Sequence, residues 1–195
     1  MQDFGPLITL NDPAFIHPTT LIYGKVTIGP GSSTWVNTVI RAENDEVAIG
    51  ANTNIQDFTM IHVGSATSAI IGDNCSVTHH CTVHGCVIED NCLIGINATI
   101  MDGAVIGANT IVAGGAFVTE GTIIPENSIV AGVPAKVIKT RNSRDANRYN
   151  AILYNLNAVA YARGEHRAWN DPATVAEAKR RLEAFQSEHG PGQHI

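Results

Sequence analysis

Aromatic and charged residues are both scarce in this sequence. They make up 6% and 15% of its 195 residues, and the 12 basic residues gather only in the short run Lys179-Arg180-Arg181. With a net charge of -6, the chain lacks the basic surface that nucleic acid or an anionic membrane requires. It also lacks an apolar run of about 20 residues and a charged N-terminal stretch leading into an apolar one. We therefore expect a soluble, cytoplasmic protein that binds neither nucleic acid nor membrane.

Cysteine is also rare. The spacing of Cys75, Cys81, Cys86 and Cys92 matches neither a C-x-x-C zinc site nor a redox motif. All but Cys86 occupy one position of the repeat described next, where small residues recur. We expect these three to be small thiols packed inward.

The sequence does contain a six-residue repeat, with an aliphatic residue at the first position and Gly or Asn at the fourth. Gly and Asn tolerate positive φ, so each hexad is expected to form a short strand followed by a corner. The first positions are Ile22, Ile28, Thr34, Ile40, Ile49, Ile55, Ile61, Ile71, Val77, Val83, Ile88, Ile94, Ile100, Ile106, Val112, Val118, Ile124 and Val130. The expected corners are Gly31, Asn52, Gly64, Asn74, Asn91, Asn97, Gly103, Asn109, Gly115, Gly121 and Asn127.

Three hexads would close a triangular coil, and about six such coils would stack at the strand spacing of about 4.8 Å. These repeats resemble the hexapeptide-repeat, left-handed β-helix family over residues 15–138. Left-handedness comes from that resemblance alone, because parallel crossovers normally run right-handed. The expected fold is an all-β solenoid, a left-handed parallel β-helix with C-terminal α-helices.

The period becomes helical after residue 138. Ser143 is expected to cap a first helix, while Asp171-Pro172 starts and Gly190-Pro191 ends a second. We thus expect an N-terminal segment (1–20), a β-helix domain (21–138) and helices (143–189) that pack on the solenoid or on a neighbouring subunit. The expected apolar stripe of the first helix is Tyr149, Ile152, Leu153, Leu156, Val159 and Ala160.

Four of the eight histidines lie between residues 62 and 84. Counting three hexads per coil places Arg41, His62 and His84 in one outward column, where His62 and His84 are close enough to share a metal ion. His79 lies on the preceding face near a corner, so it cannot easily meet His84 of its own chain. If His79 is also a ligand, another protomer must complete the site, and a closed ring of three suits a triangular prism.

Three further features of this geometry bear on the site. Asp57 lies under His79 on the same face, so Arg41 and Asp57 could pair across such an interface. Three imidazoles without a fourth protein ligand leave an open position, which is typical of a catalytic zinc. His80 occupies a corner, where His tolerates positive φ, and its expected role is structural.

Three segments, Asn54-Ile-Gln-Asp57, Ile61-His-Val63 and His79-His-Cys-Thr-Val-His-Gly-Cys86, resemble motifs of the γ-class carbonic anhydrase family. The resemblance implies a homotrimer with metal sites between subunits, and a reaction in which metal-bound hydroxide hydrates CO2 reversibly to bicarbonate. It implies Zn2+, with Fe2+ or Co2+ as alternatives. The metal ligands that it implies are His62 and His84 of one subunit and His79 of its neighbour.

The same resemblance assigns roles to three more residues. Gln56 would orient the hydroxide, and Arg41 and Asp57 would form the intersubunit pair. The chain has Arg41-Ala-Glu43 where the family has Arg-Gly-Asp, and its loop at 64–69 carries no acidic residue. Proton release would therefore depend on external buffer or on a nearby group such as His80 or Glu43.

Other functions stay open at this point. Relatives with these motifs include acyl-CoA thioesterases and proteins without hydratase activity, so a different reaction at the same metal is one alternative. The segment Ala131-Gly-Val-Pro-Ala-Lys136 resembles the end of acetyltransferase solenoids and favours a CoA-dependent acyltransferase that needs no metal. The third alternative is an inactive structural homologue.

Overall fold

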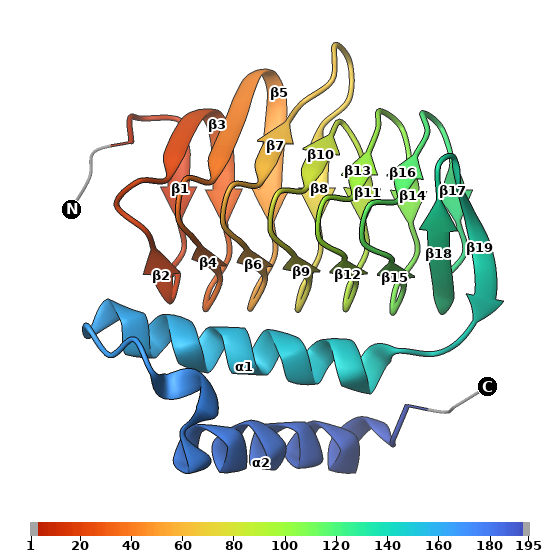
Figure 1. Ribbon diagram of the computed structural model, residues 1–195. Helices are drawn as coiled ribbons and strands as arrows, with labels where there is room; N and C mark the ends of the chain where they lie inside the picture. The colour runs from red at the N-terminus through yellow and green to blue at the C-terminus, as the bar shows by residue number, and fades with distance from the viewer. Residues whose placement is uncertain (1–3, 193–195) are drawn as a thin grey trace.

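The computed structural model describes residues 4–192 as a triangular, parallel β-solenoid flanked by helices (Figure 1). It has about seven turns and is consistent with a left-handed β-helix of hexapeptide repeats, as expected. The count of about six coils is too low by one. The additional coil comes from the N-terminal segment, since β1 (Ile8–Leu10) and β2 (Phe15–Ile16) pair in parallel with β3 (Leu21–Ile28) and β4 (Ser33–Thr34).

The strands form three faces, two of which join into one sheet because β3 and β5 (Val39–Ile49) bend from one face to the next. The first halves of β3 and β5 begin the face that we call the histidine face. It continues with β7 (Met60–His62), β10 (Thr82–His84), β13 (Thr99–Ile100) and β16 (Phe117–Val118).

The second face holds β1, the second halves of β3 and β5, and then β8 (Ala69–Ile71), β11 (Val87–Ile88), β14 (Val105–Ile106) and β17 (Ile123–Ile124). The third face holds β2, β4, β6 (Asn54–Ile55), β9 (Ser76–Val77), β12 (Leu93–Ile94), β15 (Ile111–Val112), β18 (Ser128–Gly132) and β19 (Ala135–Thr140).

The core is the stack of first-position side chains, as the repeat predicts. Every first-position residue is at most 4% exposed, including Thr34. All four cysteines are free and buried, which confirms the expectation for Cys75, Cys81 and Cys92 and extends it to Cys86. Burial raises the pKa of the Cys86 thiol to about 12, so this residue acts as a small apolar group.

The corners follow the Gly/Asn pattern with one exception. The expected corner residues have φ between 52° and 69° wherever they take the left-handed conformation, and His80 joins them with φ 58°. The prediction that Gly64 forms such a corner is wrong. The chain leaves the coil there in a short loop closed by a hydrogen bond from the Gly64 N–H to the Thr67 carbonyl oxygen (2.8 Å), and Gly85 takes a positive φ instead.

Two helices follow the solenoid, α1 (Arg144–Ala162) and α2 (Pro172–His189), joined through the short η1 (Ala168–Asn170). The Asp171 side chain accepts a hydrogen bond from the Thr174 N–H (3.0 Å), and Gly190 ends α2, which confirms both predicted signals. Ser143 does precede α1, but its buried hydroxyl makes no hydrogen bond within the described residues. No helix in residues 4–192 combines the length and the hydropathy needed to span a bilayer.

Helix α1 lies between the third face and α2 (Figure 1), and its predicted apolar stripe is only partly right. Ile152 and Ala160 are buried, but Val159 is 39% exposed. The helix instead buries several Asn and Ala residues, and Asn side chains donate to carbonyl groups at the solenoid corners. Asn147 Nδ2 donates to the Asn91 carbonyl oxygen and Asn155 Nδ2 to that of Gly31, both at 2.8 Å.

Candidate metal centre

The strand register brings Arg41, His62 and His84 into one outward column on the histidine face, as predicted. Arg41 is the partner of His62 between β5 and β7, and His62 is the partner of His84 between β7 and β10. The two imidazoles meet edge to face, with Nδ1 of His62 2.9 Å from Nε2 of His84. Each follows a core residue, Ile61 or Val83, and so points away from the core.

A carboxylate engages the other nitrogen of each ring. Asp102 Oδ1 lies 2.8 Å from Nδ1 of His84, and Glu43 Oε2 lies 3.1 Å from Nε2 of His62. Ionised carboxylates only accept hydrogen bonds, so each ring donates an N–H to its carboxylate. The other ring nitrogen, which faces the second histidine, then carries a lone pair. Two facing lone pairs at 2.9 Å repel each other unless a proton or a cation lies between them.

A metal ion meets this requirement. Two ligand nitrogens of a tetrahedral zinc, each about 2.0–2.1 Å from the ion, lie roughly 3.3 Å apart. The observed 2.9 Å is within a small ring movement of that spacing. The donor set of His62 and His84 therefore fits a metal ion.

His79 lies apart from this pair, at the corner between β9 and β10, as the hexad count predicts. Its Nδ1 is 2.9 Å from Oδ2 of Asp57, one coil below, so its Nε2 is the nitrogen without a carboxylate. Within residues 4–192, no three His, Cys, Asp or Glu side chains of one chain are grouped to hold a metal ion. The described residues of one chain therefore do not bring His79 together with His62 and His84.

Arg41 and Gln56 have partners within their own chain. Arg41 donates to Glu43. Burial acts to raise the pKa of Glu43, but hydrogen bonds from Arg41 and His62 outweigh it and hold that pKa below its ordinary value. Gln56 is 1% exposed, and its Nε2 donates to Asn54 Oδ1 at 2.9 Å. Within one described chain, Gln56 thus contacts Asn54 and Arg41 contacts Glu43, while Asp57 contacts His79.

Asp102 is the residue that sequence reasoning missed. It follows β13 on the histidine face, and Thr67 Oγ1 also donates to its Oδ1 at 3.2 Å. A Cβ added at Gly64 or Gly85 would lie 2.2 or 2.1 Å from that oxygen, so the carboxylate fits only because both neighbours are glycine. Its position in the coil above His84 was the available signal.

Three histidines differ from the others in having a carboxylate partner. Among the histidines of residues 4–192, only His62, His79 and His84 have a carboxylate within 3.1 Å. His80 instead stacks on Phe58, with ring centroids 4.9 Å apart and ring planes 3° apart.

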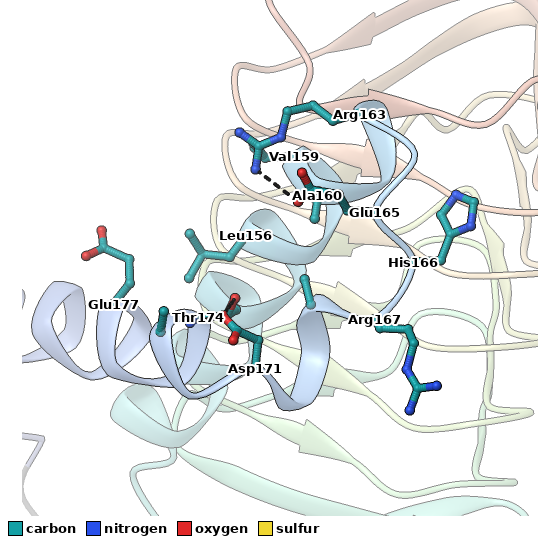
Figure 2. Close-up of a pocket in the computed structure, with 12 residues that line it drawn as sticks. Leu156, Val159, Ala160, Arg163, Glu165, His166, Arg167, Asp171, Thr174 and Glu177 are labelled. Atoms are coloured by element: carbon teal, nitrogen blue, oxygen red, sulfur yellow. Dashed lines mark hydrogen bonds and ion pairs between the residues drawn. The ribbon is translucent and has the colours of Figure 1, made fainter.

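A cavity of about 520 Å3 lies between α1, η1 and α2 (Figure 2). Its carboxylates already have partners in the chain: Asp171 caps α2, Glu165 pairs with Arg163, and Glu177 pairs with two arginines of α2. Among the residues that line this cavity, no carboxylate is without a partner, and its one histidine, His166, packs against the ring of Tyr161 and contacts no carboxylate.

Comparison with known proteins assigns the chain to a family. A family described as bacterial transferase hexapeptide (six repeats) matches residues 85–120. A probable carbonic anhydrase of Methanocaldococcus jannaschii is 49% identical over 136 residues, which cover 69% of this chain and 86% of that protein. The chain belongs to the γ-class carbonic anhydrase-like proteins of the hexapeptide-repeat family.

Further relatives differ more in length or in name. Mitochondrial γ carbonic anhydrase 2 of Arabidopsis thaliana is 38% identical over 107 residues, and the match covers 52% of this chain but only 38% of that protein. Among solved structures, a hexapeptide transferase family protein from Anaplasma phagocytophilum matches with a TM-score of 0.71 and 31% identity, over 80% of this chain and 92% of that one. The family therefore includes proteins named for two kinds of chemistry.

Proposed function

We propose that the protein is a metal-dependent carbonic anhydrase of the γ class, which hydrates CO2 reversibly to bicarbonate at sites between the subunits of a homotrimer. The proposed ligands are His62 and His84 of one subunit and His79 of the next. Zn2+ is the proposed metal, with Fe2+ and Co2+ as alternatives.

One observation carries this proposal. Each of the three histidines has one ring nitrogen against a carboxylate, Glu43, Asp57 or Asp102, and so keeps the other nitrogen free. Metal-binding histidines are usually oriented by such a carboxylate, which also raises the basicity of the ligand nitrogen. Three histidines with this arrangement, on segments that resemble motifs of the γ-class carbonic anhydrases, support a metal site better than they support a single general base.

The chain's own groups then have distinct tasks. The imidazoles of His62, His84 and the neighbouring His79 would hold a divalent cation, which would supply Lewis-acid activation of water near neutral pH. Asp102 and Glu43 fix the rings of His84 and His62, and Asp57 fixes that of His79. In the trimer, Gln56 would orient the attacking water, and Arg41 would exchange its contact with Glu43 for one with Asp57 of the neighbouring subunit.

Proton release follows from the same contacts. The loop between β7 and β8 has no acidic side chain, and Asp57 and Asp102 are occupied in holding rings, which leaves Glu43, bound to both Arg41 and His62, as the remaining carboxylate. Protons would therefore leave to external buffer, or through Glu43 or His80 at the edge of the site.

The test combines metal analysis with CO2 hydration measured by stopped flow. We expect protein purified without chelator to contain a divalent metal, to lose hydration on chelation and to regain it with Zn2+. Hydrolysis of acyl-CoA with no CO2 hydration would favour a thioesterase at the same metal. Metal-independent transfer from acetyl-CoA would favour an acyltransferase, and bound metal with no turnover a structural homologue.

A further inference from the structure

A second polar cavity lies on the far side of α1, away from the histidines. It has a volume of about 160 Å3 and is enclosed by two solenoid corners and the two helices. Figure 1 shows α1 lying between the solenoid and α2. The lining residues are Asn52, Asn74, Arg148, Ile152, Asn155, Arg181 and Phe185.

The lining contains two guanidinium groups and no carboxylate. Arg148 is half-buried over the ring of Phe185, 3.7 Å from its centroid, and has no ion-pair partner in residues 4–192. Its one hydrogen bond, from Nη1 to Asn91 Oδ1, is long at 3.3 Å. Most of the N–H groups of Arg148 therefore lack an acceptor within the described chain.

Other donors converge on the same space. Asn74 is only 8% exposed, and its side-chain amide makes no hydrogen bond to any described residue. Arg181 uses Nε on Glu177 and Nη1 on Asn155 Oδ1, at 2.7 and 3.1 Å, which leaves Nη2. The Asn74 amide, Nη2 of Arg181 and most N–H groups of Arg148 are therefore available to an acceptor in this cavity.

Size limits what this acceptor can be. The volume of about 160 Å3 is well below the roughly 300–1,000 Å3 typical of pockets for drug-sized ligands. The cavity therefore suits a small ion such as phosphate, sulfate or bicarbonate better than a nucleotide. We propose that this cavity binds a small inorganic oxyanion between Arg148, Arg181 and Asn74, independently of the proposed carbonic anhydrase site.

Burial is the main cause that lowers the pKa of Arg148, followed by repulsion from Arg144, while the charges of Asp73, Asp90 and Asp145 act to raise it. A desolvated guanidinium with no carboxylate partner gains more from an oxyanion than an exposed one does, because charge-assisted hydrogen bonds strengthen out of water.

Inorganic phosphate is the probe, added to the metal-loaded full-length protein at constant ionic strength and measured by isothermal titration calorimetry. We expect saturable binding that Arg148→Gln and Arg181→Gln each weaken by about tenfold or more. Arg180→Gln is the matched control, since Arg180 neighbours Arg181 but binds Glu177 and does not line the cavity. Phosphate binding that none of the three changes alters would lie outside this cavity, for example at the histidines, and would contradict the proposal.

Asn74→Asp keeps the proposal testable if the Arg148 variant misfolds. It preserves shape at the corner while placing a negative charge in the cavity, and we expect it to abolish phosphate binding. Asn37→Asp is its control, because Asn37 is an exposed corner with the same φ of 55°. The proposal would be overturned if the wild-type protein did not bind phosphate. It would also be overturned if the Asn74→Asp and Arg181→Gln variants bound phosphate as tightly as the wild-type protein.

Discussion

The inward and outward sides of β5, β7 and β10 carry neighbouring residues with opposite properties. Ile40, Ile61 and Val83 are 0% exposed, whereas Arg41, His62 and His84, each one residue later, point outward and bind carboxylates. Successive side chains of a strand point to opposite sides. Stability and proposed chemistry are thus separated by a single position, so a change on one side should leave the other largely intact.

Replacing His84 should give the largest effect on the outward side. We expect His84→Ala to bring metal content to background while the solenoid stays folded, since the ring lies outside the core. Elemental analysis and circular dichroism measure the two properties, and His80→Ala, a histidine with no carboxylate partner, is the control. Retention of the metal in the His84→Ala protein would remove this residue from the site.

Replacing Ile61 should give the converse result. Ile61→Ala leaves a cavity in the dry inward stack and should cost about 2–5 kcal/mol of unfolding free energy, whereas Ile61→Val should cost about 0.5–1.5 kcal/mol. Denaturant titration measures these values. The folded Ile61→Ala protein should still bind metal, and a loss of metal at full stability would show that the two sides are not independent.

Asp102 offers a finer test of the outward side. Asp102→Asn keeps the shape that fits between Gly64 and Gly85 but removes the charge facing His84, and we expect metal affinity to fall by about 10–100-fold. Competition with a metal chelator gives the affinity. Asp73→Asn is the control, because the Asp73 carboxylate accepts from the Ala51 N–H and from no histidine. Equal affinities for the two variants would contradict a positioning role for Asp102.

The smallest expected effect belongs to the inward thiols. All four cysteines are buried, and burial raises the pKa of Cys86 to about 12. At pH 8 the native Cys86 side chain is therefore both protonated and inaccessible, and the thiolate is the reactive form. Iodoacetamide should label none of the cysteines until the protein is unfolded. Rapid labelling of Cys86 in the native protein would mean that the inward side opens to water there.

The sequence could predict whatever the six-residue period determines. Inward residues, most corners and the column of Arg41, His62 and His84 follow from counting, because each hexad adds one strand and one turn. The caps at Asp171 and Gly190 were also predictable, since their chemistry is local. Counting even placed His79 correctly on the other side of a corner.

Contacts that depend on side chains reaching between coils could not be counted. Asp102 and Glu43 reach His84 and His62 through their side-chain lengths and through the glycines beside Asp102. The buried side of α1 was missed for a related reason. The predicted apolar stripe did not identify that side fully, because part of the covered surface is corner carbonyl groups, to which Asn147 donates, whereas Val159 of the stripe is exposed.

The shared site is the central claim, and mixing two inactive variants tests it most directly. His79→Ala and His84→Ala homotrimers each lack one ligand at every site. In a mixed trimer, an interface regains all three ligands where His79 comes from the His84→Ala chain and the histidine pair from the His79→Ala chain. We predict that metal binding and CO2 hydration return when the two proteins are dissociated and reassembled together. Mixed trimers that form but stay as empty of metal as their parents would contradict the claim.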